Sequence, residues 1–154
     1  MFLNDDFRDF IHALNQGGVS YILVGGYAVI LRGYSRSTGD LDIWVEKTPE
    51  NYKKLLRAFQ LFGAPAGAVP ADQFFSDAYD VFALGVPPYA IEIMTQVKGL
   101  DFRETYRKAT METMDETPVR VIHLHHLLQA KKAAGRYKDL NDIENLPREE
   151  EDQV

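Results

Sequence analysis

The chain has 154 residues, enough for one domain with a hydrophobic core, and its 45% hydrophobic and 26% charged content is typical of globular proteins. The absence of cysteine excludes disulfides, thiolate metal sites and a cysteine nucleophile. The net charge of -6 argues against a large nucleic-acid footprint, and the sequence contains neither an apolar run of membrane-helix length nor a secretory signal pattern. We therefore expect a cytoplasmic protein with one domain over residues 1–146 and an acidic, flexible tail over 147–154.

Apolar spacing and capping residues predict a mixture of helices and strands. Asn4 and Thr48 are suited to cap helices, Pro49 to occupy a first helical position, and Gly63 to end a helix. The expected elements are helix 5–15, strand 19–24, helix 27–33, strand 40–45, helix 48–63, loop 64–72, two strands within 79–95 joined at 85–88, a short helix, strand 118–124, helix 124–135 and helix 138–146. This order has too few βαβ units for a doubly wound sheet. It predicts an α/β (α+β) fold, with a central mixed sheet flanked by helices and a short C-terminal helical segment.

Three carboxylates fall on the expected strands. Alternation along strand 40–45 places Asp40 and Asp42 on one face, about 6 to 7 Å apart, and Glu92 lies on a later strand. Magnesium prefers oxygen ligands, commonly one or two carboxylates together with substrate phosphates. The pattern therefore suits one shared ion, or two ions, bridged to a triphosphate. The alternative is a solvated edge strand.

A glycine pair precedes these carboxylates. Gly25 and Gly26 follow an apolar strand and open a helix, where free backbone N–H groups and the lack of side chains allow a phosphate to approach. A plain tight turn is the alternative. The combination with Asp-x-Asp one short helix later favours a phosphate site.

These motifs resemble a known family. The stretch "LVGGYAVILRGYSRSTGDLDIWV" is similar to the nucleotidyltransferase superfamily that includes DNA polymerase beta. Within it, "RSTGDLDIWV" resembles minimal bacterial members, among them the AbiEii-type toxin enzymes, and "GVPPYAIEIM" and "AKKAAGRYKDLNDIENL" match the same group. The resemblance implies that Asp40, Asp42 and Glu92 are catalytic and bind Mg²⁺, and that Gly25 and Gly26 hold the phosphates of an NTP. The family often has Asp at the third acidic position. Glu92 either serves as ligand or base from a more distant strand, or marks a site that binds nucleotide and turns over poorly.

Basic residues supply the remaining candidates for nucleotide binding. Lys131 continues a helical stripe of leucines and is expected to point inward, where it either reaches the triphosphate or extends to the rim of the core. Arg36 either contacts phosphate or neutralises the Asp pair, and Asp139 with Asp142 reads as a helix cap pair. The further nucleotide-binding candidates are Thr38, Arg136 and Lys138.

The resulting hypothesis is a magnesium-dependent nucleotidyltransferase. It would move a nucleoside monophosphate from an NTP to a hydroxyl acceptor (a protein, a tRNA or a small molecule) and release pyrophosphate. An antitoxin-type protein partner follows from the resemblance, and no membrane partner is expected. One alternative is a weakly active or inactive relative that binds nucleotide or a partner. Another is an interaction protein that uses the surface around Phe74 and Phe75.

Overall fold

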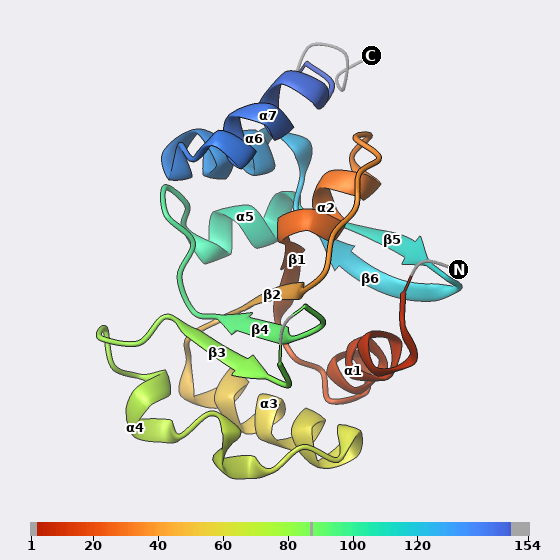
Figure 1. Cartoon of the computed structure of the whole chain (residues 1–154). Helices are drawn as coiled ribbons and strands as arrows, with labels where there is room; N and C mark the ends of the chain where they lie inside the picture. Colours follow the sequence, from red (N-terminus) through yellow and green to blue (C-terminus); the bar gives the residue numbers. More distant parts are fainter. Residues whose placement is uncertain (1–2, 87, 149–154) are drawn as a thin grey trace.

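A single mixed sheet of six strands runs through the molecule in the order β3-β4-β2-β1-β6-β5 (Figure 1). The structure is a computed structural model and describes residues 3–86 and 88–148. β1 is parallel to β6 and β2 is parallel to β4, while the other neighbouring pairs are antiparallel. The strands are β1 (Tyr21–Val24), β2 (Leu41–Val45), β3 (Val81–Leu84), β4 (Ile91–Met94), β5 (Thr110–Met114) and β6 (Thr117–Val121).

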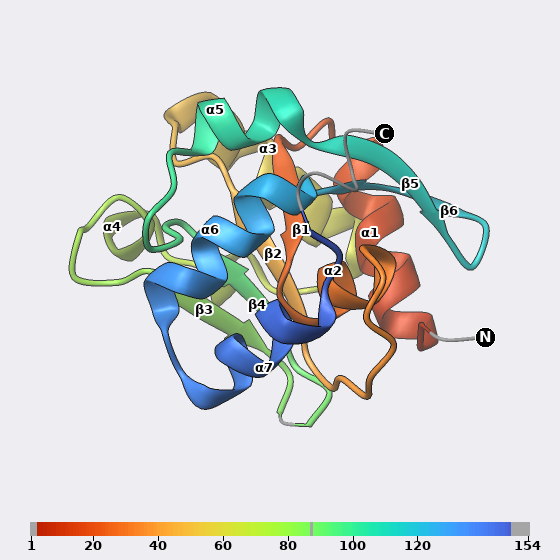
Figure 2. The same cartoon turned by 90° about the horizontal axis from the view of Figure 1, so that it is seen from above.

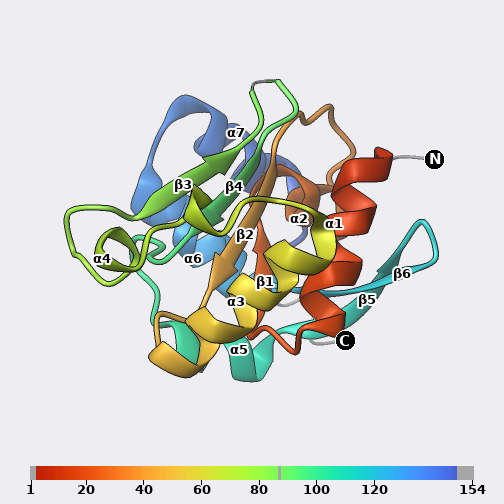
Figure 3. The same cartoon turned by 90° about the horizontal axis from the view of Figure 1, so that it is seen from below.

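Helices cover both faces of this sheet. α1 and α3 pack together on one face with α4 beside them, and α5, α6 and α7 lie over the opposite face (Figures 2 and 3). The helices are α1 (Asp5–Gln16), α2 (Gly25–Leu31), α3 (Pro49–Phe62), α4 (Ala71–Phe74), α5 (Phe102–Lys108), α6 (Leu124–Ala134) and α7 (Tyr137–Asn145), with a 3-10 turn at Ala66–Ala68. The sheet with its flanking helices and the C-terminal pair α6–α7 confirms the predicted fold class. No helix in the described ranges is long and apolar enough to cross a membrane.

Strand alternation divides β2 between a face packed in the core and a face that lines a cavity. Leu41, Ile43 and Val45 are completely buried on the side of α1 and α3, where they join the main hydrophobic core. Asp42 faces the other way, toward α6 and α7, and Trp44 on that same face packs edge-on against Phe102 of α5. The apolar alternation that stabilises the sheet therefore also fixes the side on which Asp42 is presented.

The capping predictions hold where they can be tested. The Asn4 side chain accepts a hydrogen bond from the Phe7 amide at 2.8 Å, and the Thr48 hydroxyl accepts one from the Asn51 amide at 3.2 Å. α3 ends at Gly63, whose φ is 93°. These local signals place both helix starts and one helix end correctly.

Three parts of the expected element order were wrong. α2 begins at Gly25, two residues earlier than predicted, so the glycine pair forms its first turn. α4 falls within and beyond the expected loop 64–72, and it has only four residues, too few for a periodic signal. β5 was not predicted, because as an edge strand it buries mainly Met114 and lacks clear alternation. Of the predicted flexible tail, residues 149–154 lie outside the described residues, and the domain boundary at 146 stays a prediction.

Candidate active site

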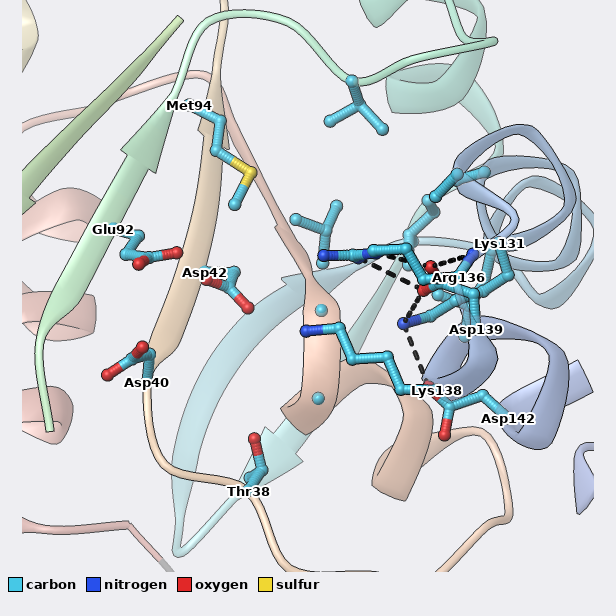
Figure 4. Close-up of a pocket in the computed structure, with 18 of the residues that line it drawn as sticks. Thr38, Asp40, Asp42, Glu92, Met94, Lys131, Arg136, Lys138, Asp139 and Asp142 are labelled. Atoms are coloured by element: carbon cyan, nitrogen blue, oxygen red, sulfur yellow. Dashed lines mark hydrogen bonds and ion pairs between the residues drawn. The ribbon is translucent and has the colours of Figure 1, made fainter. Parts of the chain in front are cut away.

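The register between β2 and β4 brings two of the predicted carboxylates together. Asp42 and Glu92 are direct partners in this parallel pair, and their side chains lie on the same face of the sheet (Figure 4). Asp40 stands just before β2, and its Oδ1 accepts a hydrogen bond from the Ala90 amide at 2.9 Å. That bond anchors the segment before β2 to the start of β4. All three carboxylates line one cavity of about 630 Å³.

The lack of space requires glycine at both positions, and the backbone conformation also favours glycine at position 25. Val24 is the partner of Asp42 across the antiparallel β1–β2 pair, so Gly25 follows at the level of the Asp42 carboxylate. Gly25 has a φ of 71°, and a β-carbon there would stand 1.9 Å from Asp42 Oδ2. A β-carbon at Gly26 would stand 2.0 Å from the Thr38 hydroxyl oxygen. Any side chain at either position would displace a group that lines the cavity.

The environment of Asp42 disfavours its negative charge. Burial is the largest cause, followed by hydrogen bonding with Glu92 and by the negative charges of Glu92 and Asp40, and together they raise the pKa of Asp42 to about 8. The positive charge of Lys138 acts in the opposite direction. Without a cation in the cavity, the raised pKa therefore favours the protonated form of Asp42 near neutral pH. Such a carboxylate cluster is suited to receive positive charge.

The opposite wall of the cavity holds an ionic cluster around the buried residues Lys131, Asp139 and Asp142. Lys131 Nζ lies 3.2 Å from Asp139 Oδ1 and 3.0 Å from Asp142 Oδ2. Arg36 binds Asp142 with both ends of its guanidinium, at 2.8 Å and 3.0 Å, and Arg136 Nε binds Asp139 at 2.7 Å. We call these five residues the ionic cluster. It joins the loop before β2 to α6 and α7, and its three cations outnumber its two carboxylates.

Hydrogen bonds keep both aspartates of the ionic cluster charged. Burial raises the pKa of Asp139, but hydrogen bonds from Arg136 and Lys131 outweigh it and hold the pKa below its ordinary value. At Asp142, burial is likewise outweighed by hydrogen bonds from Arg36 and Lys131, which lower the pKa. The wall is thus a fixed arrangement of charges with a net positive sign, and it faces Asp42, whose pKa is raised.

Every residue predicted for the site lines this cavity. Lys131 is buried as its helical spacing predicts, and its partners are two aspartates of the protein. Arg36 binds Asp142, so its expected alternative role beside Asp40 and Asp42 is not what the structure shows. Lys138 extends from α7 toward the carboxylates (Figure 4). The cavity-lining residues that were predicted are Gly25, Gly26, Arg36, Thr38, Asp40, Asp42, Glu92, Lys131, Arg136 and Lys138.

Asp139 and Asp142 are the site residues that sequence reasoning assigned to a different role. The cap interpretation holds in part, because the Asp139 carboxylate accepts a hydrogen bond from the Arg136 amide at 3.1 Å. Both side chains are nevertheless almost fully buried and line the cavity. The signal that could have found them is the inward-pointing Lys131, since a buried ammonium requires carboxylates within reach. Their spacing of three residues presents both carboxylates on one face of α7.

The cavity supplies part of a metal site. In the described part of the chain, no three His, Asp or Glu side chains are drawn together closely enough to hold a metal ion unaided. Oxygen donors from Asp40, Asp42 and Glu92 nevertheless have the chemistry that magnesium prefers, and magnesium commonly completes its shell with water and substrate phosphates. The donor set therefore fits a magnesium ion that arrives with a phosphorylated substrate.

Comparison with known proteins agrees on the fold. No family model matches the chain, and no curated protein matches it either. Among solved structures, a "putative nucleotidyltransferase" from Thermotoga maritima superposes with a TM-score of 0.64 at 18% identity, covering 90% of this chain and 88% of that one. The chain thus has the fold of that protein, a mixed sheet flanked by helices.

Two structures from Helicobacter pylori are more distant. The protein JHP933 superposes with a TM-score of 0.46 at 15% identity, covering 90% of this chain and 61% of that one. A second "putative nucleotidyltransferase" has a TM-score of 0.39 at 16% identity, with coverages of 82% and 54%. The chain spans less than two thirds of both proteins, and similarities of this size carry no argument about function.

Proposed function

We propose that the chain is a magnesium-dependent nucleotidyltransferase that transfers a nucleoside monophosphate from an NTP to a hydroxyl acceptor. The observation that carries the proposal is the closeness of Gly25 to Asp42, where backbone without side chains meets a carboxylate whose pKa is raised to about 8. A phosphate can approach the glycine backbone while a cation bridges it to the carboxylate. The fold shared with the Thermotoga maritima protein supports this assignment.

The two walls of the cavity would bind different parts of the magnesium–NTP complex. Asp40, Asp42 and Glu92 would hold magnesium, which when bound neutralises phosphate charge and helps to orient the attacking oxygen. Lys138 and the cations of the ionic cluster would contact the triphosphate from the other side. The negative charge of the triphosphate would thereby lie between cations on both sides. Because the ionic cluster is already paired by Asp139 and Asp142, its side chains need little rearrangement when nucleotide binds.

The chemical step would be an in-line displacement at the α-phosphorus. The acceptor's hydroxyl oxygen forms a new bond to the α-phosphorus, while the bond to the oxygen that bridges the α- and β-phosphorus breaks. Pyrophosphate leaves with that electron pair, and the hydroxyl proton passes to Glu92 or Asp42. The raised pKa of Asp42, about 8, supports a proton-accepting role at this place.

The fold does not specify the hydroxyl acceptor or a protein partner, and both are part of this proposal. A hydroxyl on a protein, a tRNA end or a small molecule would each suit the reaction, and the resemblance to toxin-type members suggests an antitoxin-type partner. The alternative of an interaction protein required an exposed surface around Phe74 and Phe75, and only part of that surface is present. Phe74 is completely buried, and only Phe75 of that pair is exposed.

Thermal unfolding tests the nucleotide site directly. Magnesium with a non-hydrolysable NTP should raise the melting temperature, because ligand at 100 times its dissociation constant stabilises by about 2.7 kcal/mol. Asp42→Asn should remove most of this shift and keep the fold. A wild-type protein whose melting temperature responds to none of the four magnesium NTPs would contradict the proposal. A clear shift without any transfer would support the nucleotide-binding alternative instead.

A further inference from the structure

A second cavity, of about 770 Å³, lies at the carboxyl ends of the parallel strands β2 and β4. Its wall comes from the segment after β2, the segment after β4 and the first turn of α5. Its volume falls in the range of small-molecule sites, commonly about 300 to 1,000 Å³. None of the residues assigned above to nucleotide or magnesium lines it. We call it the acceptor cavity.

Two buried polar groups in this wall lack hydrogen-bond partners. The indole nitrogen of Trp44 and the hydroxyl of Thr95 are both completely covered and unpaired among the described residues. Trp44 is 2% exposed and Thr95 is 6% exposed. Buried polar groups are almost always paired in proteins, so two such groups in one wall require an explanation. After a local movement of the wall uncovers them, both groups could pair with an oxygen-rich ligand, since the indole donates and a hydroxyl can donate and accept.

The acceptor cavity adjoins the catalytic one. Val97 lines both cavities. Trp44 follows Asp42 by two residues on the same face of β2, a rise of about 6 to 7 Å. Met94, two residues after Glu92 on β4, lines the catalytic cavity (Figure 4). A ring-sized molecule held at Trp44 would therefore extend a substituent to the level of the catalytic carboxylates.

The charges that line the acceptor cavity sum to zero and therefore favour neither a polyanion nor a polycation. Three acidic residues and three basic residues line it, namely Glu46, Asp80, Asp101, Lys47, Lys98 and Arg103. Part of this charge is paired internally, since Arg103 Nε lies 3.3 Å from Glu46 Oε2. Trp44 and Phe102 add aromatic surface, with their ring centroids 5.1 Å apart. The preferred ligand is accordingly uncharged, with oxygens around an apolar frame.

We infer that this cavity binds the hydroxyl acceptor, and that the acceptor is a neutral polyhydroxylated ring compound. The inference rests on the proposed nucleotidyl transfer and specifies its second substrate. One hydroxyl of the ring attacks the α-phosphorus, its proton passes to Glu92 or Asp42, and pyrophosphate leaves. A free sugar or cyclitol and the ribose of a nucleoside share this chemistry.

Trp44 is the sole tryptophan of the chain, so its fluorescence reports the cavity directly. The experiment titrates methyl glucoside, myo-inositol and uridine separately into protein saturated with magnesium and a non-hydrolysable NTP. At least one compound should change the Trp44 emission saturably. A response to the first two identifies a sugar or cyclitol, and a response to uridine alone identifies a ribose. A silent Trp44 with all three compounds overturns the inference.

Substitutions at Thr95 test the contact itself. Thr95→Val, which removes the hydroxyl and keeps the shape, should weaken ring binding about tenfold or more without lowering the melting temperature. Thr95→Ser should retain binding, as should Thr113→Val on exposed β5. Equal affinities for the Val and Ser variants would overturn the inference.

The melting shift with magnesium NTP, measured on the same samples, reports the nucleotide site separately. A normal shift with a silent Trp44 refutes only the acceptor cavity. A responding Trp44 without any shift refutes the transferase and keeps the ring-binding site.

Discussion

Gly25 and Asp42 occupy the same small space, and a β-carbon at position 25 would stand 1.9 Å from the Asp42 carboxylate oxygen. The contact follows from strand pairing, since Val24 and Asp42 are partners across β1 and β2. A substitution at Gly25 should therefore displace the Asp42 carboxylate, and a larger side chain at position 42 should displace the backbone at Gly25.

The first prediction separates this steric contact from backbone strain. Gly25→Ala should abolish the melting shift caused by magnesium NTP, because the new methyl group displaces the Asp42 carboxylate. Gly63→Ala is the matched control, since Gly63 also has a positive φ but has nothing within 4 Å of a β-carbon. Both variants should lose about 1 to 2 kcal/mol of stability from backbone strain. Equal nucleotide responses in the two variants would contradict the steric account.

Asp42 should make the metal-free protein less stable as pH rises. Its pKa is raised from 3.8 to about 8 in the folded state, so the folded protein holds a proton that the unfolded chain releases. This contribution to stability is complete below the ordinary pKa and is lost as pH rises through about 8. Urea unfolding in EDTA should show a loss of roughly 1 to 3 kcal/mol, reduced from the full linkage value by contact with solvent in the cavity.

Asp42→Asn provides the comparison for this pH dependence. The variant cannot ionise, so its stability should vary less over the same pH interval. A wild-type protein whose stability changes with pH no more than that of the variant would show that Asp42 titrates normally.

Lys131→Met should destabilise the fold. Lys131 is the shared partner of Asp139 and Asp142, and its removal leaves two buried carboxylates with only Arg36 and Arg136. Breaking a buried ion pair costs about 3 to 5 kcal/mol, and the remaining arginines should reduce this to about 2 to 4 kcal/mol. Lys132→Met, at an exposed position of the same helix, is the control and should be neutral. Unchanged stability of Lys131→Met would contradict the structural role of Lys131 in the ionic cluster.

Lys138→Met should affect binding and spare the fold. Lys138 is exposed, yet it lines the cavity and its charge lowers the pKa of Asp42. Calorimetric titration with a non-hydrolysable NTP should show an affinity loss of roughly 1.5 to 3 kcal/mol, the scale of a charged hydrogen bond. The melting temperature without ligand should hardly change. Lys54→Met, at an exposed position of α3, is the control, and equal affinities of the two variants would exclude Lys138 from the nucleotide site.

The sequence was most informative where structure depends on local chemistry. Thr48 and Gly63 mark the start and the end of α3, because capping and a left-handed turn are decided within a few residues. Alternation predicted that Asp42 lies on the face opposite Leu41 and Ile43, and Glu92 on the face opposite Ile91 and Ile93, because a period of two needs no knowledge of the partner strand. β5 was not predicted, because an exposed edge strand has little alternation of apolar and polar residues to detect.

Long-range relationships in the site could not be read in the same way. The contact of Gly25 with Asp42 depends on the register of two strands, which the sequence does not state. Asp142 is reached by Arg36 from 106 positions away in the chain, so its role depends on how α7 packs against the loop before β2. The local pattern around Asp139 and Asp142 is the same for a helix cap and for a buried ionic cluster.

Transfer of labelled nucleotide tests the central claim most directly. The protein is incubated with magnesium and a cell extract, once with NTP labelled at the α-phosphate and once with NTP labelled at the γ-phosphate. The account predicts that the α-label becomes attached to an acceptor, that the γ-label leaves in pyrophosphate, and that Asp42→Asn abolishes both events. Attachment of the γ-label would indicate phosphoryl transfer, and the absence of any acceptor labelling together with the absence of pyrophosphate release would contradict nucleotidyl transfer.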